Sequence, residues 1–113
     1  MAYINFSERK KVKIWEGITA RLFHSDQITF GHVILEKGAD VLEHSHVNEQ
    51  WTHIIEGEMM FNINGEQKLL TPGMAAFIPS NVTHSAKAIT LCKVIDCFLP
   101  VRADFVELEN LTS

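Results

Sequence analysis

With 113 residues, of which 46% are hydrophobic, the chain has the size and composition of one globular domain, residues 1–113, built around a single core. Its formal net charge of −4 argues against a nucleic-acid partner, and no apolar run approaches the roughly 18 residues of a membrane span, so we expect no membrane partner. The N-terminal letters MAYINFSERKK lack the apolar block of a signal peptide, which makes the cytoplasm the expected location.

The first local feature is a basic cluster at residues 9–13, with the sequence RKKVK. Such a cluster forms either a solvated strand at the edge of a sheet, where lysine discourages further pairing, or a patch that binds phosphate. We favour the edge strand.

From residue 18 to residue 100, short apolar runs alternate with turn residues. The runs are ITARLFH, QITFGHVILE, DVLEHSH, QWTHIIEG, EMMFNI, EQKLL, MAAFIP, THSAKAI and LCKVIDCFLP. About eight to ten short strands at this spacing, without a convincing helical pattern, predict an all-β fold, either a closed barrel or a sandwich. The strongest local signal is INGE at residues 63–66, because Asn-Gly favours the type I′ turn of a tight hairpin. Only the tail at residues 101–111, VRADFVELENL, is compatible with a short helix or an irregular cap.

Three of the six histidines lie in the stretch EHSHVNEQWTHIIEG, residues 43–57. Side chains alternate between the two faces of a strand, so His44 and His46 point the same way, about 6.6 Å apart, and can converge on one ion. A turn at residues 47–49 can bring Gln50 back opposite them. These three side chains form a candidate metal pocket, and the alternative is that the histidines are ordinary surface or core residues.

The strand after this turn has a second face. Trp51, His53 and Ile55 alternate with Gln50 and therefore point away from the candidate pocket. An exposed row of aromatic and aliphatic side chains usually marks a protein interface, so we expect a homodimer that pairs through this face.

The last apolar run leads into VIDCFLPVRADF, residues 94–105. Alternation places Asp96 and Phe98 on one face of a strand that Pro100 ends, with Arg102 just beyond it. An aspartate in an apolar strand is costly to bury unless it is paired or functional. Two interpretations therefore remain open, an Asp96–Arg102 ion pair at the rim of a barrel and a functional pair in a cavity.

Two spaced patterns resemble the two sequence signatures of the cupin superfamily. The first pattern consists of Gly38, five residues, His44-Ser-His46, three residues, Gln50, six residues and Gly57. The second pattern consists of Gly73, five residues, Pro79-Ser-Asn81, two residues and His84. Gln50 stands where the superfamily usually has an acidic ligand, and Asn81 stands where it usually has glycine.

The resemblance implies a small antiparallel jelly-roll β-barrel with a metal ion inside. The implied ligands are His44, His46, Gln50 and His84. Glu49 is an alternative to Gln50, although the six-residue interval to Gly57 favours Gln50. Three imidazoles and one amide are all neutral, so the ion keeps its full double positive charge and should attract an anionic, oxygen-rich substrate. We expect one divalent transition metal per chain, such as Zn, Ni, Fe or Mn.

A narrower resemblance lies near the C-terminus. The pattern Asp96-x-Phe98-x-Pro100-x-Arg102, followed by Asp104-Phe105, resembles that of the KdgF-type cupins of pectin and alginate breakdown. Those enzymes convert cyclic 4,5-unsaturated uronates into linear ketone forms. The resemblance therefore implies a small anionic uronate sugar as substrate, with Asp96, Phe98 and Arg102 as catalytic residues.

Two other functions are compatible with the same residues. One is another metal-dependent small cupin enzyme, such as a lyase, a polyketide cyclase or a dioxygenase, with the same four ligands and a different substrate. The other is a non-catalytic cupin that binds a metal or a small ligand.

Overall fold

The computed structural model describes residues 3–113, which form ten strands, one α-helix and a short 3₁₀ helix. The strands are β1 (Val12–Trp15), β2 (Ile18–His24), β3 (Thr29–Leu35), β4 (Asp40–His44), β5 (Glu49–Glu56), β6 (Met59–Ile63), β7 (Glu66–Leu70), β8 (Ala75–Ile78), β9 (His84–Ala88) and β10 (Cys92–Leu99). The 3₁₀ helix η1 covers Phe6–Glu8, and the helix α1 covers Ala103–Leu111. The tail that allowed either a helix or an irregular cap is therefore a helix.

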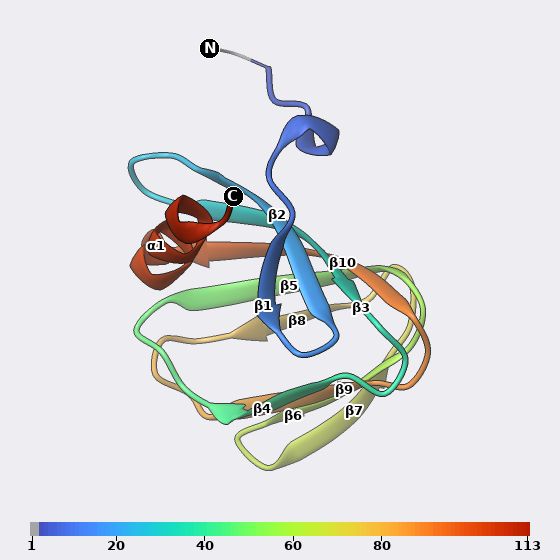
Figure 1. Ribbon diagram of the computed structural model, residues 1–113. Coiled ribbons are helices and arrows are strands. Elements are labelled where there is room, and N and C mark those ends of the chain that lie inside the picture. Colours follow the sequence, from blue (N-terminus) through green and yellow to red (C-terminus); the bar gives the residue numbers. More distant parts are fainter. Residues whose placement is uncertain (1–2) are drawn as a thin grey trace.

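The strands form two antiparallel sheets that face each other (Figure 1). The six-stranded sheet has the order β1-β2-β3-β10-β5-β8, and the four-stranded sheet has the order β4-β9-β6-β7. Strands that are distant in the sequence are neighbours, since β10 lies between β3 and β5, and β9 lies between β4 and β6. This arrangement is a small antiparallel jelly-roll barrel, which confirms the predicted fold class. Across residues 3–113, no helix combines the length and the apolar character needed to cross a membrane.

Alternation of side chains along the strands separates the core from the surface. In β3 the side chains of Val33 and Leu35 are buried, whereas that of Ile34 between them is exposed. Both sheets contribute their inner faces to one core, whose largest fully buried side chains include Leu22, Ile54, Met59 and Ile78. Burying one such side chain stabilises the fold by about 1.5–3 kcal/mol.

The hairpin between β6 and β7 turns at Asn64 and Gly65, as the sequence predicts. Both residues have positive φ angles, 50° and 88°, which a type I′ turn requires. The Asn62 side chain accepts a hydrogen bond of 2.9 Å from the Gly65 amide, and Ile63 pairs with Glu66 across the two strands. The turn thus sets the register of this hairpin.

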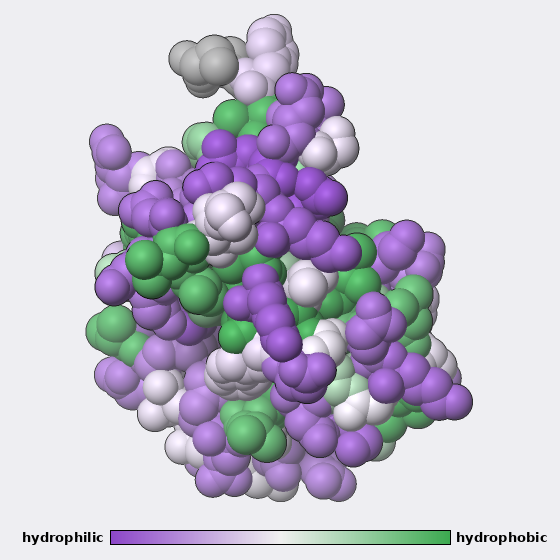
Figure 2. Space-filling model, viewed as in Figure 1, coloured by the Kyte–Doolittle hydropathy of each residue, from purple (hydrophilic) through white to green (hydrophobic). Residues whose placement is uncertain are grey.

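The basic cluster divides into two parts. Lys13 lies on β1, at the edge of the six-stranded sheet, and pairs with Glu16 at the surface, as expected for a solvated edge strand. Figure 2 shows hydrophilic side chains gathered over this N-terminal segment. Arg9 differs, because its Nε donates to the Leu22 carbonyl at 2.7 Å and its Nη2 lies 3.3 Å from both carboxylate oxygens of Glu109 in α1. The prediction of a solvated cluster is therefore wrong for Arg9, which ties the helix to the barrel.

We expect Gly57→Ala to destabilise the protein strongly. Gly57 has a φ of +91°, and an added Cβ would clash with the Leu91 carbonyl oxygen. Gly73→Ala is the matched control, because Gly73 has a φ of +92° but an added Cβ meets nothing within 4 Å. The control should lose only about 1–2 kcal/mol, for the left-handed backbone alone. Urea unfolding measures both losses, and equal losses would contradict a steric role for Gly57.

Candidate functional site

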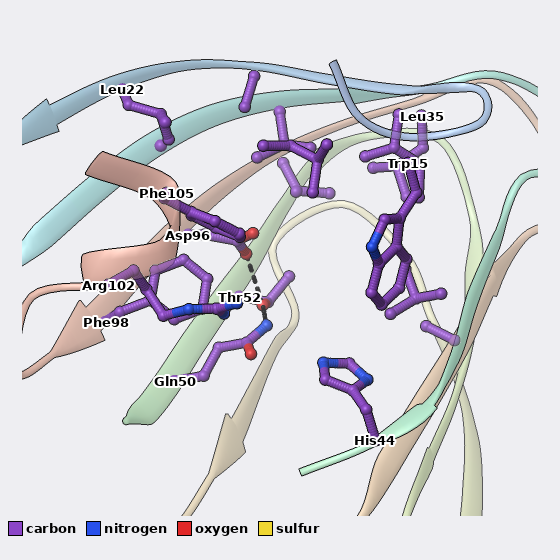
Figure 3. A pocket seen from close by; sticks show the side chains of 18 of the residues that line it. Trp15, Leu22, Leu35, His44, Gln50, Thr52, Asp96, Phe98, Arg102 and Phe105 are labelled. Atoms are coloured by element: carbon purple, nitrogen blue, oxygen red, sulfur yellow. Dashed lines mark hydrogen bonds between the residues drawn. The ribbon is translucent and has the colours of Figure 1, made fainter. Parts of the chain in front are cut away.

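A cavity of about 270 Å³ lies inside the barrel (Figure 3). Side chains from both sheets line it, and most of the wall is apolar. The polar lining residues include His44, Gln50, Thr52, His84, Asp96 and Arg102. These few polar side chains therefore decide what chemistry the cavity supports.

Three histidines come together at this site. His44 ends β4, His46 follows in the turn before β5, and His84 begins β9. Antiparallel pairing of β4 with β9 sets His44 opposite His84. One ring nitrogen of each histidine lies within 4.8 Å of those of the other two, a spacing that allows the three to bind one metal ion.

Hydrogen bonds to main-chain carbonyls hold the loop of His46 against the turn that precedes His84. The Asn81 amide donates to the His46 carbonyl at 2.8 Å, and the Ser80 hydroxyl donates to the Val47 carbonyl at 2.6 Å. Asn81 has a φ of 63°, in the left-handed region. Glycine adopts this conformation most readily and asparagine next, which explains how Asn81 can occupy a position where cupins usually have glycine.

Each of the three imidazoles is oriented by the backbone. The Nδ1 atom lies at hydrogen-bonding distance from a main-chain carbonyl two residues away, at 2.7 Å for His44 and at 2.9 Å for His46 and His84. Because a carbonyl can only accept, Nδ1 carries the proton in each ring and Nε2 carries the free lone pair. The Nε2 atom of His84 is buried and has no hydrogen-bond partner among residues 3–113. Histidines that bind metals through Nε2 have this arrangement.

Burial keeps two of these rings neutral. It lowers the pKa of His84 from 6.5 to about 4. It also lowers the pKa of His46, to which the positive charge of Arg102 adds a smaller effect. A histidine must be unprotonated to bind a metal, so neither ring has to release a proton at neutral pH. The donor set therefore fits a divalent transition metal.

Gln50 lies beside the histidines at the start of β5. Its Oε1 atom is 3.0 Å from the Nε2 atom of His46. Since His46 carries its proton on Nδ1, both of these atoms present lone pairs, and a shared cation would make their approach favourable. The neighbouring Glu49 is exposed and does not line the cavity. The geometry thus brings Gln50, and not Glu49, to His46 and into the cavity that His44 and His84 line.

Asp96 projects inward from β10, opposite Thr52 of β5. The Thr52 hydroxyl donates to its Oδ1 atom at 2.6 Å. Burial raises the pKa of Asp96 from 3.8 to about 6, although the Thr52 bond and the Arg102 charge oppose the rise. Thr52 is a residue that the sequence alone does not predict for this site. Its only signal was its position two residues after Gln50, on the same face of the strand.

Arg102 lies just before α1, and its ion-pair partner is Asp104. Its Nε and Nη2 atoms donate to the two carboxylate oxygens of Asp104 at 2.9 and 2.7 Å. The guanidinium also lies over the rings of Phe98 and Phe105, at 4.8 and 3.9 Å from their centroids. The alternative of an Asp96–Arg102 ion pair is therefore wrong, because the helix begins directly after Arg102 and places Asp104 beside it. Figure 3 shows Asp96, Phe98 and Arg102 together in the cavity.

The outer face of β5 carries two exposed apolar side chains. Trp51 and Ile55 point away from the cavity and are 53% and 46% exposed. Trp51 pairs across the sheet with Phe77 of β8, and their ring centroids are 6.4 Å apart. The homodimer expected from this face stays a prediction.

Known proteins resemble this chain both in sequence and in structure. The model of the cupin domain family matches residues 31–98. An RmlC-like cupin from Shewanella frigidimarina NCIMB 400 is 28% identical, with a TM-score of 0.87 over 93% of this chain and 96% of that one. KdgF from Halomonas sp. is 26% identical, with a TM-score of 0.86 over 93% of this chain and 98% of that one. The polyketide cyclase RemF from Streptomyces resistomycificus shares the fold, with 18% identity and a TM-score of 0.77 over 88% and 79% of the two chains. The search of curated proteins returned no match.

We expect the wild-type protein to bind one divalent ion per chain, because the three histidines present free Nε2 atoms to one point. Elemental analysis and titration with Zn²⁺ measure the stoichiometry and the affinity. The double variant His46→Ala/His84→Ala should lose most of this affinity, whereas His32→Ala, on the exposed face of β3, should keep it. Unchanged affinity in the double variant would contradict the site.

The raised pKa of Asp96 predicts a pH-dependent stability of the metal-free protein. Between its ordinary value of 3.8 and about 6, the folded state keeps a proton that the unfolded state releases, so stability falls as the pH rises through this window. Asp96→Asn removes this pH dependence. The melting temperature of the variant minus that of wild type should therefore be larger at pH 8 than at pH 4.

Asp104→Asn provides a control of opposite sign. The Arg102 bond lowers the pKa of Asp104, so this carboxylate stabilises the fold above its ordinary pKa and ceases to do so in acid. The variant should be less stable than wild type at pH 8. If the difference in melting temperature between Asp96→Asn and wild type did not change with pH, this would contradict the raised pKa of Asp96.

Proposed function

The chain belongs to the cupin domain family, and we propose that it is a metal-dependent cupin enzyme that opens the ring of 4,5-unsaturated uronate sugars. One observation carries the proposal. Asp96, Phe98 and Arg102, which match the KdgF-type pattern, line the same cavity as His44 and His84. The structural similarity to KdgF from Halomonas sp. also supports it.

The metal ligands in this proposal are His44, His46, Gln50 and His84. A divalent ion held by these neutral groups would supply Lewis-acid polarisation of a substrate oxygen. The three imidazoles are held by main-chain carbonyls of residues two positions away, so the site needs little rearrangement to accept the ion.

Arg102 is suited to bind the substrate carboxylate. Asp104 engages its Nε and Nη2 atoms, and Nη1 forms no hydrogen bond with any residue from 3 to 113. The aromatic rings of Phe98 and Phe105 hold the guanidinium plane in place. Charge-assisted hydrogen bonds from Nη1 would fix the carboxylate in the cavity.

Asp96 is suited to move the proton. In the proposed reaction, water adds across the enol-ether double bond, with hydroxyl on the carbon that bears the carboxylate and a proton on its neighbour. The new hydroxyl then gives up its proton as the bond from its carbon to the ring oxygen breaks, and the ring oxygen gains a proton, which leaves a ketone and an open chain. Asp96 would accept a proton from the adding water and return one to the neighbouring carbon. A pKa of about 6 lets this group do both near neutral pH.

A second candidate is a metal-dependent cupin enzyme that acts on a less polar substrate. The observation that favours it is the apolar character of most of the cavity wall, which includes Trp15, Leu22 and Met59. A sugar needs polar partners for its hydroxyl groups, and this wall offers few. The same assay distinguishes the two candidates.

We expect the wild-type enzyme, loaded with Zn, Ni, Mn or Fe, to accelerate the loss of the ultraviolet absorbance of a 4,5-unsaturated uronate. Asp96→Asn keeps the shape of the side chain but cannot shuttle the proton, so turnover should fall about 10²-fold or more while the metal content stays at the wild-type level. Arg102→Ala should mainly raise KM. Asp26→Asn, the same change at an exposed residue, is the control and should have no effect.

Two outcomes would count against the proposal. A wild-type enzyme that leaves the decay unaccelerated with each of these metals would favour the second candidate. An active Asp96→Asn variant would remove Asp96 from the reaction and leave the rest of the site to be assigned.

A further inference from the structure

A chain of two hydrogen bonds links the proposed acid to the proposed amide ligand. The Gln50 Nε2 atom donates to the Thr52 hydroxyl at 2.8 Å, and the Thr52 hydroxyl donates to Asp96 Oδ1 at 2.6 Å. Figure 3 shows the three side chains in line, with both bonds drawn. Thr52 is 2% exposed, so almost no water competes for its hydroxyl.

The direction of these bonds follows from the number of protons available. A threonine hydroxyl has one hydrogen, and here it goes to the carboxylate of Asp96, which accepts it. The hydroxyl oxygen then offers only lone pairs to Gln50, and of the two ends of the amide only the NH₂ group can bond to them. The amide oxygen is therefore turned to the other side, where it lies 3.0 Å from His46 Nε2.

A flipped amide would have the opposite effect. It would set the Gln50 oxygen against the lone pairs of Thr52 and turn the NH₂ hydrogens toward the three histidines. Those hydrogens carry partial positive charge and would repel a cation. An acidic ligand does not depend on its orientation in this way, because a carboxylate presents an oxygen to the ion in either orientation.

We propose that Thr52 is a positioning residue that holds the amide oxygen of Gln50 toward the metal. This inference rests on the metal site of the proposed function, but not on the identity of the substrate. Gln50 can serve as a ligand only if a neighbour fixes which end of its amide faces the ion, and the Thr52 hydroxyl is that neighbour.

The test is a double-mutant cycle read out as Zn²⁺ affinity, measured by competition with a chromophoric chelator. Thr52→Val removes the hydroxyl with little change of volume and should weaken Zn²⁺ binding by about 10- to 100-fold. In the Gln50→Glu background the same change should have little effect, because the carboxylate needs no orienting partner. Thr52→Ser keeps the hydroxyl and should bind Zn²⁺ like wild type.

Each outcome bears on the inference. An equal loss in both backgrounds would mean that Thr52 acts through packing, and an undiminished affinity in Thr52→Val would mean that the amide is held by other contacts. Either result overturns the positioning role while leaving the metal site intact, whereas a wild-type protein that binds no Zn²⁺ overturns both. Circular dichroism and melting temperature check folding, and Thr52→Ala replaces Thr52→Val in the cycle if the valine variant does not fold.

Discussion

The register of β10 against β5 is the constraint on which the cavity depends. It sets Asp96 opposite Thr52 and Phe98 opposite Gln50. The side chains of a strand repeat every two residues, so a shift of one position would turn Asp96 outward and bring Ile95 inward. An acid, a hydroxyl and an amide therefore meet inside an apolar barrel because one pairing register aligns two strands that lie far apart in the sequence.

Burial also shifts the pKa values of the titratable groups in this cavity. It raises the pKa of Asp96 and lowers that of His84, and in both cases it favours the neutral form. The guanidinium of Arg102 has neighbours on two sides, because Asp104 binds one edge of it and two aromatic rings cover its plane. The cavity thus combines neutral metal-ligand groups with the Arg102–Asp104 ion pair and with Asp96, so an anionic guest would bind at the guanidinium of Arg102.

Local patterns made most of the fold predictable from the sequence, because alternation and turn chemistry act over a few residues. The Asn64-Gly65 hairpin and the approach of Gln50 to His46 across a short turn are of this kind. The partner of Arg102 was not predictable, since it depends on where a helix starts, and the sequence offers Asp96 as readily as Asp104. The role of Thr52 was not predictable either, because threonine is common in strands and only its contacts distinguish it from a structural residue.

The position of β10 within the six-stranded sheet also has a consequence for synthesis on the ribosome. It is the last strand of the chain, yet it lies between β3 and β5, which are made long before it. Until Cys92–Leu99 emerges, both of those strands keep an unpaired edge, and the nascent chain cannot close its barrel. Folding of the barrel is therefore deferred until β10 has been synthesised, and the strand that completes the sheet is also the strand that carries Asp96.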